Sequence, residues 1–278
     1  MKLRMKQTRL AVEIIALMLA LVVFGIPLSY VLTNAGKTSQ AAAEMNIAPS
    51  KTTQYLSNFS EVIATSDYMI IRAFFNSTFI TVMSILLLIG LSSMAGFVLE
   101  RRKGRAISWI NFLVLAGLMI PPAVVPTIWL LKMLGLYKSM FGLILVEVAL
   151  SFPFSVLLYR GYMGAIPREL DEASFIDGCG GFDLFFKVIF PLMKPVSTTI
   201  AIITSITIFN DFVNPLYFLP GSRNVTIQLT LYNFISTYMN KWNLLFADIL
   251  LISIPPLVFF ILFNKKIVSG MVAGAVKS

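Results

Sequence analysis

Six long apolar segments alternate along the chain with shorter polar or basic ones. Each is about as long as the roughly 20 residues that a helix needs to cross the hydrocarbon core of a bilayer. The segments lack the period of two that marks the strands of a transmembrane β-barrel. We therefore predict an all-α, polytopic membrane protein with six transmembrane helices. We expect these helices at residues 10–32, 73–99, 106–131, 139–163, 195–219 and 244–264.

The composition agrees with a chain that is surrounded by lipid. Of the 278 residues, 58% are hydrophobic and only 13% are charged, whereas soluble domains carry about 25% charged residues. This excludes an ordinary cytosolic enzyme and a disordered protein. We expect one transmembrane domain, residues 10–264, between an N-terminus at residues 1–9 and a tail at residues 265–278.

The basic residues report on topology. The chain has 22 Lys and Arg against 13 Asp and Glu, which gives a net charge of +9. Such an excess could suggest nucleic-acid binding, but the basic residues flank the apolar segments. Fifteen of them lie in the two termini and in the loops after the second and fourth segments. Because cytoplasmic loops are enriched in Lys and Arg, both termini are predicted to be cytoplasmic, with lipid rather than nucleic acid as neighbour.

The first apolar segment has two interpretations. Its basic start, followed downstream by Ala41-x-Ala43, resembles a secretory signal peptide. Its apolar stretch is longer than the about 7–15 residues of a typical signal peptide, so we expect a retained anchor. The following residues 33–67 are too polar to cross the membrane and are expected to form an outer capping loop or linker.

Most catalytic chemistry is excluded. The chain has no His, and Cys179 is its single cysteine. His-based metal sites, Ser-His-Asp triads and Cys-His dyads therefore cannot form, and we expect neither catalytic residues nor a metal site. Gly36-Lys37-Thr38 imitates the end of a phosphate-binding loop but lacks the required glycine, since Val31 stands in its place. If ATP drives this protein, another subunit binds it.

The loop between the fourth and fifth segments, residues 164–194, is amphipathic and interrupted. Pro167 is suited to open a first helix, in which Leu170, Ala173 and Ile176 share a face. Gly178 is suited to the left-handed conformation that closes it. Asp183 is then expected to cap a second helix.

An apolar stripe marks the second helix of this loop. Phe182, Phe185, Phe186 and Ile189 recur at helical spacing, and Pro191 is expected to end the helix. One interpretation is a helix that lies in the headgroup region of the membrane. The other is a helix docked into the groove of a partner, where each buried aromatic side chain would contribute about 1.5–3 kcal/mol.

The loop resembles the EAA loop of binding-protein-dependent ABC importer permeases. The resemblance rests on Glu172-Ala173-Ser174, Asp177-Gly178, Ile189-Phe190-Pro191-Leu192 and Pro195. Ser174 departs from the usual second alanine but is also small. In that family the loop forms the coupling helix that sits in the ATPase subunit. The resemblance implies coupling roles for Glu172, Ala173, Ser174, Asp177, Gly178, Phe182, Phe185, Phe186 and Pro191.

Further segments are similar to the carbohydrate branch of that family. They include Asn210-Asp211-Phe212 and the end of the chain, Ser269–Lys277. The resemblance implies a maltose-permease-like smaller subunit with a type I permease fold in a bacterial-type cytoplasmic membrane. Its implied partners are a second permease, two ATPase subunits that hold ATP and Mg²⁺, an extracellular solute-binding protein and a sugar. In the tail it implies ATPase contact for Gly270, Gly274 and Lys277.

Polar residues within the apolar segments suggest a pathway. Asn210, Asp211 and Asn214, which we call the polar strip, could offer hydrogen bonds to sugar hydroxyls. The alternative is that they bond helix to helix. Glu147 and Asp248 are weaker candidates. A proton-coupled secondary transporter that uses these acids, a permease for another small solute, and a scaffold without solute remain alternatives.

Two smaller features concern packing and the membrane interface. Ser92-x-x-x-Gly96 is expected to allow the close approach of a neighbouring helix. Trp109, Trp129 and Trp242 are expected to act as interface anchors.

Overall fold

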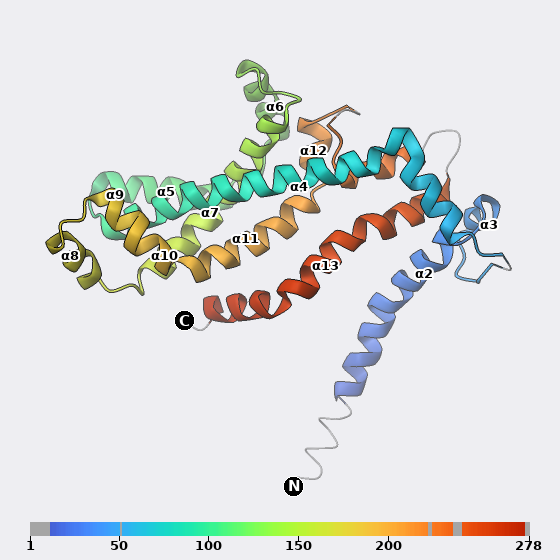
Figure 1. Ribbon diagram of the computed structural model, residues 1–278, viewed down its shortest axis with the longest axis horizontal. Coiled ribbons are helices and arrows are strands. Elements are labelled where there is room, and N and C mark those ends of the chain that lie inside the picture. The colour runs from blue at the N-terminus through green and yellow to red at the C-terminus, as the bar shows by residue number, and fades with distance from the viewer. Residues whose placement is uncertain (1–11, 51, 222–223, 236–240, 276–278) are drawn as a thin grey trace, which may run out of the picture. The chain divides into compact units, whose positions relative to one another are not determined.

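The computed structural model describes residues 12–50, 52–221, 224–235 and 241–275 (Figure 1). The described residues form helices and turns, and no strand occurs among them. The prediction of an all-α protein is therefore confirmed. Residues 12–20 are α-helical. The α-helices longer than four residues that follow them are α2 (Ile26–Ala35), α3 (Ser39–Ala43), α4 (Tyr55–Arg101), α5 (Arg105–Met119), α6 (Val124–Met133), α7 (Met140–Met163), α8 (Glu169–Ile176), α11 (Lys194–Phe209), α12 (Val213–Phe218) and α13 (Trp242–Ala275).

The chain divides into two compact units. The first unit comprises Met1–Ile71 and Thr230–Pro255, and the second comprises Arg72–Leu229 and Pro256–Ser278. Each unit thus combines segments that are far apart in the sequence.

A buried polar network organises the first unit. Lys37 is buried, and its ammonium group donates to the backbone oxygen of Asn46 at 2.7 Å and to its side-chain oxygen at 2.8 Å. Asn58 donates to the carbonyls of Ala35 and Lys37 and accepts from Asn243 at 3.0 Å. Residues 33–67, expected as a loop or linker, therefore contain α3, the start of α4 and a hydrogen-bonded core.

Helix α4 is long but not continuous. It covers 47 residues, and Ser66, Asp67 and Tyr68 within it have positive φ angles of 53–57°. Left-handed φ values interrupt a right-handed helix. The apolar segment expected at residues 73–99 lies after this break.

The third expected helix, residues 106–131, is divided. Helix α5 ends at Met119 and α6 begins at Val124, with Pro121-Pro122 between them. Proline lacks the N–H that continues a helix and forces the preceding residue out of the helical region, which explains the interruption. Ile120, before the first proline, has a ψ of 120°.

Four helical segments are long and apolar enough to cross a membrane. They are Val12–Ala35, which includes a π-helical turn at Leu21–Gly25, together with Tyr55–Arg101, Met140–Met163 and Trp242–Phe263. A fifth candidate is the pair Gly181–Leu192 and Lys194–Phe209, bent by 70°. The described helices establish a polytopic membrane protein, and the count of six remains a prediction.

Helix α7 is the centre of the second unit. A Cβ at Gly96 of α4 would lie 2.5 Å from the Cβ of Tyr159 on α7, so only glycine permits this approach. The predicted packing role of Gly96 is thereby confirmed. The buried Tyr159 also donates to Ser197 of α11 at 2.7 Å. The core around them is apolar and includes Leu88, Leu143, Met163, Ile189 and Ile200.

Candidate functional site

The first helix of loop 164–194 is short and mostly exposed. Helix α8 begins at Glu169, two residues after Pro167, with Arg168 as its cap residue. Three acidic residues occupy its first turn, where they complement the positive end of the helix dipole. Ser174 is the one buried residue of α8, and its hydroxyl donates to the carbonyl of Leu170 at 2.7 Å.

A tight turn follows this helix at Gly178. Its φ is +85°, the left-handed conformation expected from the sequence. The amide of Gly178 donates to the carbonyl of Phe175, and that of Cys179 donates to the carbonyl of Ser174 at 2.9 Å. These bonds satisfy carbonyls that the end of a helix leaves free.

The second helix differs from the expected regular one. It consists of α9 (Gly181–Asp183), a π-helical turn at Leu184–Ile189 and α10 (Phe190–Leu192). Gly180 rather than Asp183 is its cap residue, and Asp183 instead forms an ion pair with Lys187 at 2.8 Å. The prediction of Asp183 as a cap was therefore wrong.

The apolar stripe is divided between two faces. Phe182 is 81% exposed and Phe186 is half exposed, whereas Phe185 is 5% exposed and Ile189 is buried. Phe185 packs against Phe97 of α4, with ring centroids 5.5 Å apart. A π-helical turn has more residues per turn than an α-helix, so residues spaced for one α-helical stripe diverge. The expectation of one continuous stripe was wrong.

Pro191 does not end this helix. The helix continues to Leu192, and the chain bends by 70° at Met193 before α11. Proline normally clashes with the preceding turn of an α-helix. Here the wider π-helical turn precedes it, with the amide of Phe190 donating to the carbonyl of Phe185.

Large exposed apolar residues occur on both sides of the glycine turn along the chain. They include Phe175, Ile176, Phe182 and Phe186, and Ile176 is 86% exposed. Glu172, Ala173 and Asp177 are also exposed beside them. Of the nine residues to which the family resemblance assigns coupling, Ser174 and Phe185 are thus turned inward.

The polar strip lies at a break in the fifth apolar segment. Helix α11 ends at Phe209, α12 begins at Val213, and Asn210, Asp211 and Phe212 connect them. The carboxylate of Asp211 accepts from the amide of Val213 at 2.8 Å and thereby supports the start of α12. The side chain of Asn210 is exposed and accepts from Gln228 at 3.3 Å.

Glu147 joins this strip from α7. The side-chain amide of Asn214 donates to its carboxyl at 3.1 Å, and the carboxyl of Asp211 interacts with it electrostatically. Glu147 is itself buried. Sequence reasoning ranked Glu147 low because it is close to the start of α7. Its position inside an apolar segment was the available signal, since an acid there needs a polar partner.

Asp248 belongs to another environment. It lies in the first unit, where it is fully buried and accepts from the hydroxyl of Thr230 at 2.9 Å. The tail candidates Gly270 and Gly274 fall within α13, and Lys277 lies outside the described residues.

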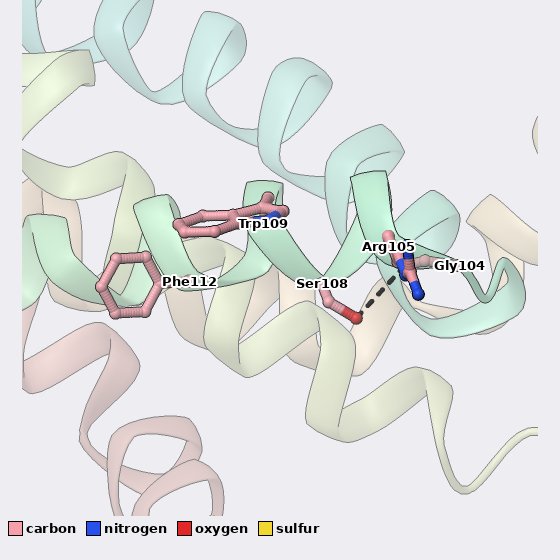
Figure 2. A pocket seen from close by; sticks show the side chains of 5 residues that line it. All are labelled: Gly104, Arg105, Ser108, Trp109 and Phe112. Carbon is pink, nitrogen blue, oxygen red and sulfur yellow. Dashed lines mark hydrogen bonds between the residues drawn. The ribbon is translucent and has the colours of Figure 1, made fainter.

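An open hollow lies at the start of α5 (Figure 2). It is lined by Gly104, Arg105, Ser108, Trp109 and Phe112. Trp109 is 67% exposed, and its ring meets that of Phe112 edge to face with centroids 5.9 Å apart. This exposure suits the predicted interface anchor. In the part of the chain that the structure describes, no three Cys, Asp or Glu side chains gather closely enough to hold a metal ion.

Comparisons with known proteins agree with the sequence resemblance. The chain is similar to the probable starch degradation products transport system permease protein AmyC of Thermoanaerobacterium thermosulfurigenes, with 33% identity covering 74% of this chain and 76% of AmyC. It is equally similar, at 33% identity and the same coverage, to the melibiose/raffinose/stachyose import permease protein MelC of Bacillus subtilis.

A solved structure shares the fold. It is a crystal structure of a bacterial ABC transporter involved in the import of the acidic polysaccharide alginate, with a TM-score of 0.77 and 18% identity. The match covers 93% of this chain and 97% of that chain. The expected importer-permease fold is thereby confirmed.

A family model matches residues 89–273, which include loop 164–194 and the polar strip. Its description is "Binding-protein-dependent transport system inner membrane component". The match covers more than half of the chain, so this protein belongs to the family of inner membrane components of binding-protein-dependent transport systems, and its role is that of a transport permease rather than an enzyme.

Proposed function

We propose that the chain is a permease subunit of an ATP-binding-cassette importer and forms half of the transmembrane pathway for a sugar or oligosaccharide. Family membership supports the importer, and the names of AmyC and MelC support the solute class. An extracellular binding protein delivers the solute. A second permease forms the other half of the pathway.

Loop 164–194 couples this permease to an ATPase subunit. The observation that carries this role is the set of exposed apolar side chains beside the Gly178 turn, of which Phe182 and Ile176 are more than 80% exposed. A water-exposed aromatic side chain gains free energy when a partner covers it. A groove on the ATPase would receive these side chains, while Glu172 and Asp177 remain at the polar rim.

The assembly contains two ATPase subunits, and they bind ATP and Mg²⁺. Both termini and loop 164–194 face the cytoplasm, as the Lys and Arg distribution favours. Gly270, Gly274 and Lys277 of the tail approach the ATPase as well. The membrane is the cytoplasmic membrane of a bacterium.

The polar strip lines the solute pathway. Asn210 is exposed, and Asn210 and Asn214 have amide and carbonyl groups of the kind that bind hydroxyls. The bond between Asn214 and Glu147 supports the competing role, helix-to-helix bonding. We assign solute contact to Asn210 and a supporting role to Asn214 and Asp211.

Transport assays in right-side-out membrane vesicles test this function. Vesicles from the source strain are loaded with ATP and supplied with binding protein and radiolabelled maltotriose or raffinose. We expect uptake to persist when an uncoupler collapses the proton gradient and to disappear when the gene for this chain is deleted. Loss of uptake on addition of the uncoupler would instead indicate a proton-coupled transporter.

The same assay distinguishes a sugar from another small solute, and it distinguishes solute binding by the polar strip from helix-to-helix bonding. Uptake of neither sugar by vesicles that take up another small solute would overturn the sugar assignment. Asn210→Ala is expected to raise the half-saturating solute concentration, because it removes hydrogen bonds to the solute. An unchanged concentration dependence would remove Asn210 from the pathway.

A further inference from the structure

The first helix of loop 164–194, α8, buries little of its surface against the rest of the second unit. Seven of the eight residues of α8 are not buried, so apolar packing holds this helix weakly. Its contact within the loop is with the π-helical turn at Leu184–Ile189. Direct transmission of force from α8 to α4, α5 and α7 therefore requires a further, polar connection.

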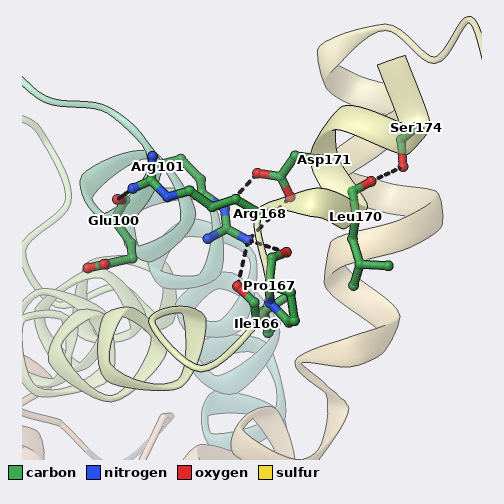
Figure 3. Close-up of polar contacts among 8 residues, drawn as sticks. All are labelled: Glu100, Arg101, Ile166, Pro167, Arg168, Leu170, Asp171 and Ser174. Carbon is green, nitrogen blue, oxygen red and sulfur yellow. Dashed lines mark hydrogen bonds and ion pairs between the residues drawn. The ribbon is translucent and has the colours of Figure 1, made fainter. Parts of the chain in front are cut away.

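The side chain of Arg101 supplies this connection (Figure 3). Arg101 is the last residue of α4, and its guanidinium forms an ion pair with Asp171 of α8 at 2.7 Å. The two side chains are only 10% and 15% exposed. The same guanidinium donates to the carbonyl of Ile166 at 3.1 Å and to that of Pro167 at 3.4 Å. One side chain thus holds α8 and the segment that leads into it.

A second junction adjoins the first. The carboxylate of Glu100 accepts from Arg160 of α7 at 3.1 Å, and Arg160 donates to Asn111 of α5 at 2.6 Å. Arg168, the cap residue of α8, donates to the backbone carbonyl of Glu100 at 3.2 Å. Two consecutive residues at the end of α4 therefore link α8 to α4, α5 and α7.

The chemistry of the junction favours a rigid link. A guanidinium presents its donors in a fixed plane that suits a carboxylate. Here Nη2 donates to Oδ1 of Asp171 at 3.2 Å, and Nε forms the ion pair with Oδ2 at 2.7 Å. A partly buried pair is screened by water and salt less than an exposed one. By contrast, the neighbouring Arg102 is exposed, and Asp183 and Lys187 form an exposed pair within a single helix.

We propose that Arg101, with Asp171, is a positioning residue that transmits the movement of loop 164–194 to the transmembrane helices. This proposal rests on the proposed function, because it assumes that an ATPase moves the loop. Arg101 binds neither solute nor nucleotide. It makes α8 and α4 move as one body, and the Glu100 junction carries that movement to α5 and α7.

The test uses the intact transport complex, purified through a tag on this chain and reconstituted in liposomes with binding protein. The variants are Arg101→Ala, Arg101→Lys and Asp171→Asn, with Arg102→Ala as the matched control. Four quantities are measured: the amount of ATPase subunit that copurifies, the basal hydrolysis of ATP, its stimulation by the solute-loaded binding protein, and the ATP-dependent uptake of solute by the liposomes.

We expect Arg101→Ala and Asp171→Asn to retain the ATPase subunit and basal hydrolysis but to lose stimulation and uptake by about 5- to 150-fold, the range of typical coupling free energies. Arg101→Lys, which keeps the charge but not the planar fork, should lose less. Arg102→Ala should behave as wild type. If Arg101→Ala fails to accumulate, Arg101→Lys and Asp171→Asn decide.

The double exchange Arg101→Asp with Asp171→Arg gives an independent measure. It restores opposite charges at the same place, so we expect it to recover part of the stimulation that each single exchange loses. Wild-type stimulation in Arg101→Ala, or loss of the ATPase subunit from all the variants, would overturn the proposal. Absence of ATP-dependent uptake by the wild-type complex would instead overturn the proposed function.

Discussion

Gly178 has the most restricted backbone conformation of loop 164–194. Its φ of +85° lies in the region that glycine adopts freely and that costs other L-residues about 1–2 kcal/mol. Space is not the constraint, because a Cβ at this position would meet no atom within 4 Å. The demand for glycine is therefore purely conformational.

Substitution of Gly178 by Val is expected to disturb the turn without affecting insertion into the membrane. Strain at φ +85° would change the relative positions of the exposed residues Ile176 and Phe182, so stimulation of ATP hydrolysis should fall while the amount of protein in the membrane stays unchanged. Immunoblots of membranes and hydrolysis by the purified complex measure the two effects.

Gly180 provides the matched control. Its φ of −74° and ψ of 169° lie in the extended region that valine prefers, and a Cβ there also meets open space. Gly180→Val should couple normally. Equal defects in both variants would show that bulk, rather than backbone conformation, is what the turn rejects.

At the scale of single residues, the sequence predicts the backbone conformation that a residue favours. It does not predict which side chains form ion pairs or hydrogen bonds with one another. The left-handed conformation of Gly178 follows from residue type, whereas the burial of Ser174 does not. The pairing of Arg101 with Asp171 joins positions 70 residues apart. A single sequence contains no signal that selects this partner among the basic residues between the second and third apolar segments.

At the scale of elements, the second helix of the loop illustrates a limit of periodicity. Spacing of i, i+3, i+4 and i+7 predicts one face only if every turn is α-helical. The π-helical turn at Leu184–Ile189 separates Phe185 from Phe182. Pro191 follows this turn and is evident in the sequence, but the sequence did not predict that a π-helical turn would precede it.

The two faces of this helix predict opposite consequences of losing an aromatic ring. Phe185→Ala removes a buried side chain that packs against Phe97 and should cost about 3–5 kcal/mol of stability. Phe182→Ala removes an exposed side chain and should change stability by less than about 0.5 kcal/mol. Its effect should be weaker retention of the ATPase subunit.

Thermal unfolding of the permease in detergent, with and without the ATPase subunit, measures both effects. We expect Phe185→Ala to lower the unfolding temperature of the permease alone, and Phe182→Ala to lower only the salt concentration or temperature at which the ATPase subunit dissociates. Retention of the ATPase by Phe182→Ala at wild-type strength would contradict the docking surface.

For other elements, the position along the chain was predictable, but the interruptions within them were not. The expected segments 106–131 and 195–219 each lie on helices, and both are interrupted. Pro121-Pro122 signals the first interruption. The second falls at Asn210–Phe212, ahead of Pro215, where the carboxylate of Asp211 bonds the amides of Val213 and Asn214. Hydropathy averages over such breaks because the flanking residues remain apolar.

At the scale of the whole molecule, composition alone gave the class, and the family resemblance gave the fold. A chain with 58% hydrophobic residues that is surrounded by lipid must satisfy its backbone polar groups in helices or in a closed barrel, and the lack of a period of two in its apolar segments favours helices. The division into two units, each built from distant segments, was not predictable. It depends on contacts such as that of Asn58 with Asn243, for which the sequence shows only two asparagines.

The orientation of the whole molecule can be tested through Cys179, the single cysteine of the sequence. Because loop 164–194 is proposed to face the cytoplasm, a membrane-impermeant maleimide should label Cys179 in inside-out vesicles stripped of ATPase and should not label it in intact spheroplasts. Gel-shift of the labelled protein measures the reaction.

A second cysteine position controls for access. Ala48 is exposed in the segment expected to lie outside, so Ala48→Cys in a Cys179→Ala background should react in spheroplasts. Reaction of Cys179 in spheroplasts, with Ala48→Cys protected, would reverse the proposed topology.

Phe185 and Ile189 are buried, whereas Phe182 and Ile176 are exposed. This difference bears on how a permease could come to work with a different ATPase subunit. The buried residues are constrained by packing inside the permease, whereas the exposed residues are constrained only by the partner protein that they contact. If the exposed residues of this loop are replaced by those of a related permease, and the buried residues are left unchanged, the subunit should therefore bind that relative's ATPase. Compatibility between separately evolved importers would then depend on a handful of side chains at the tip of one loop.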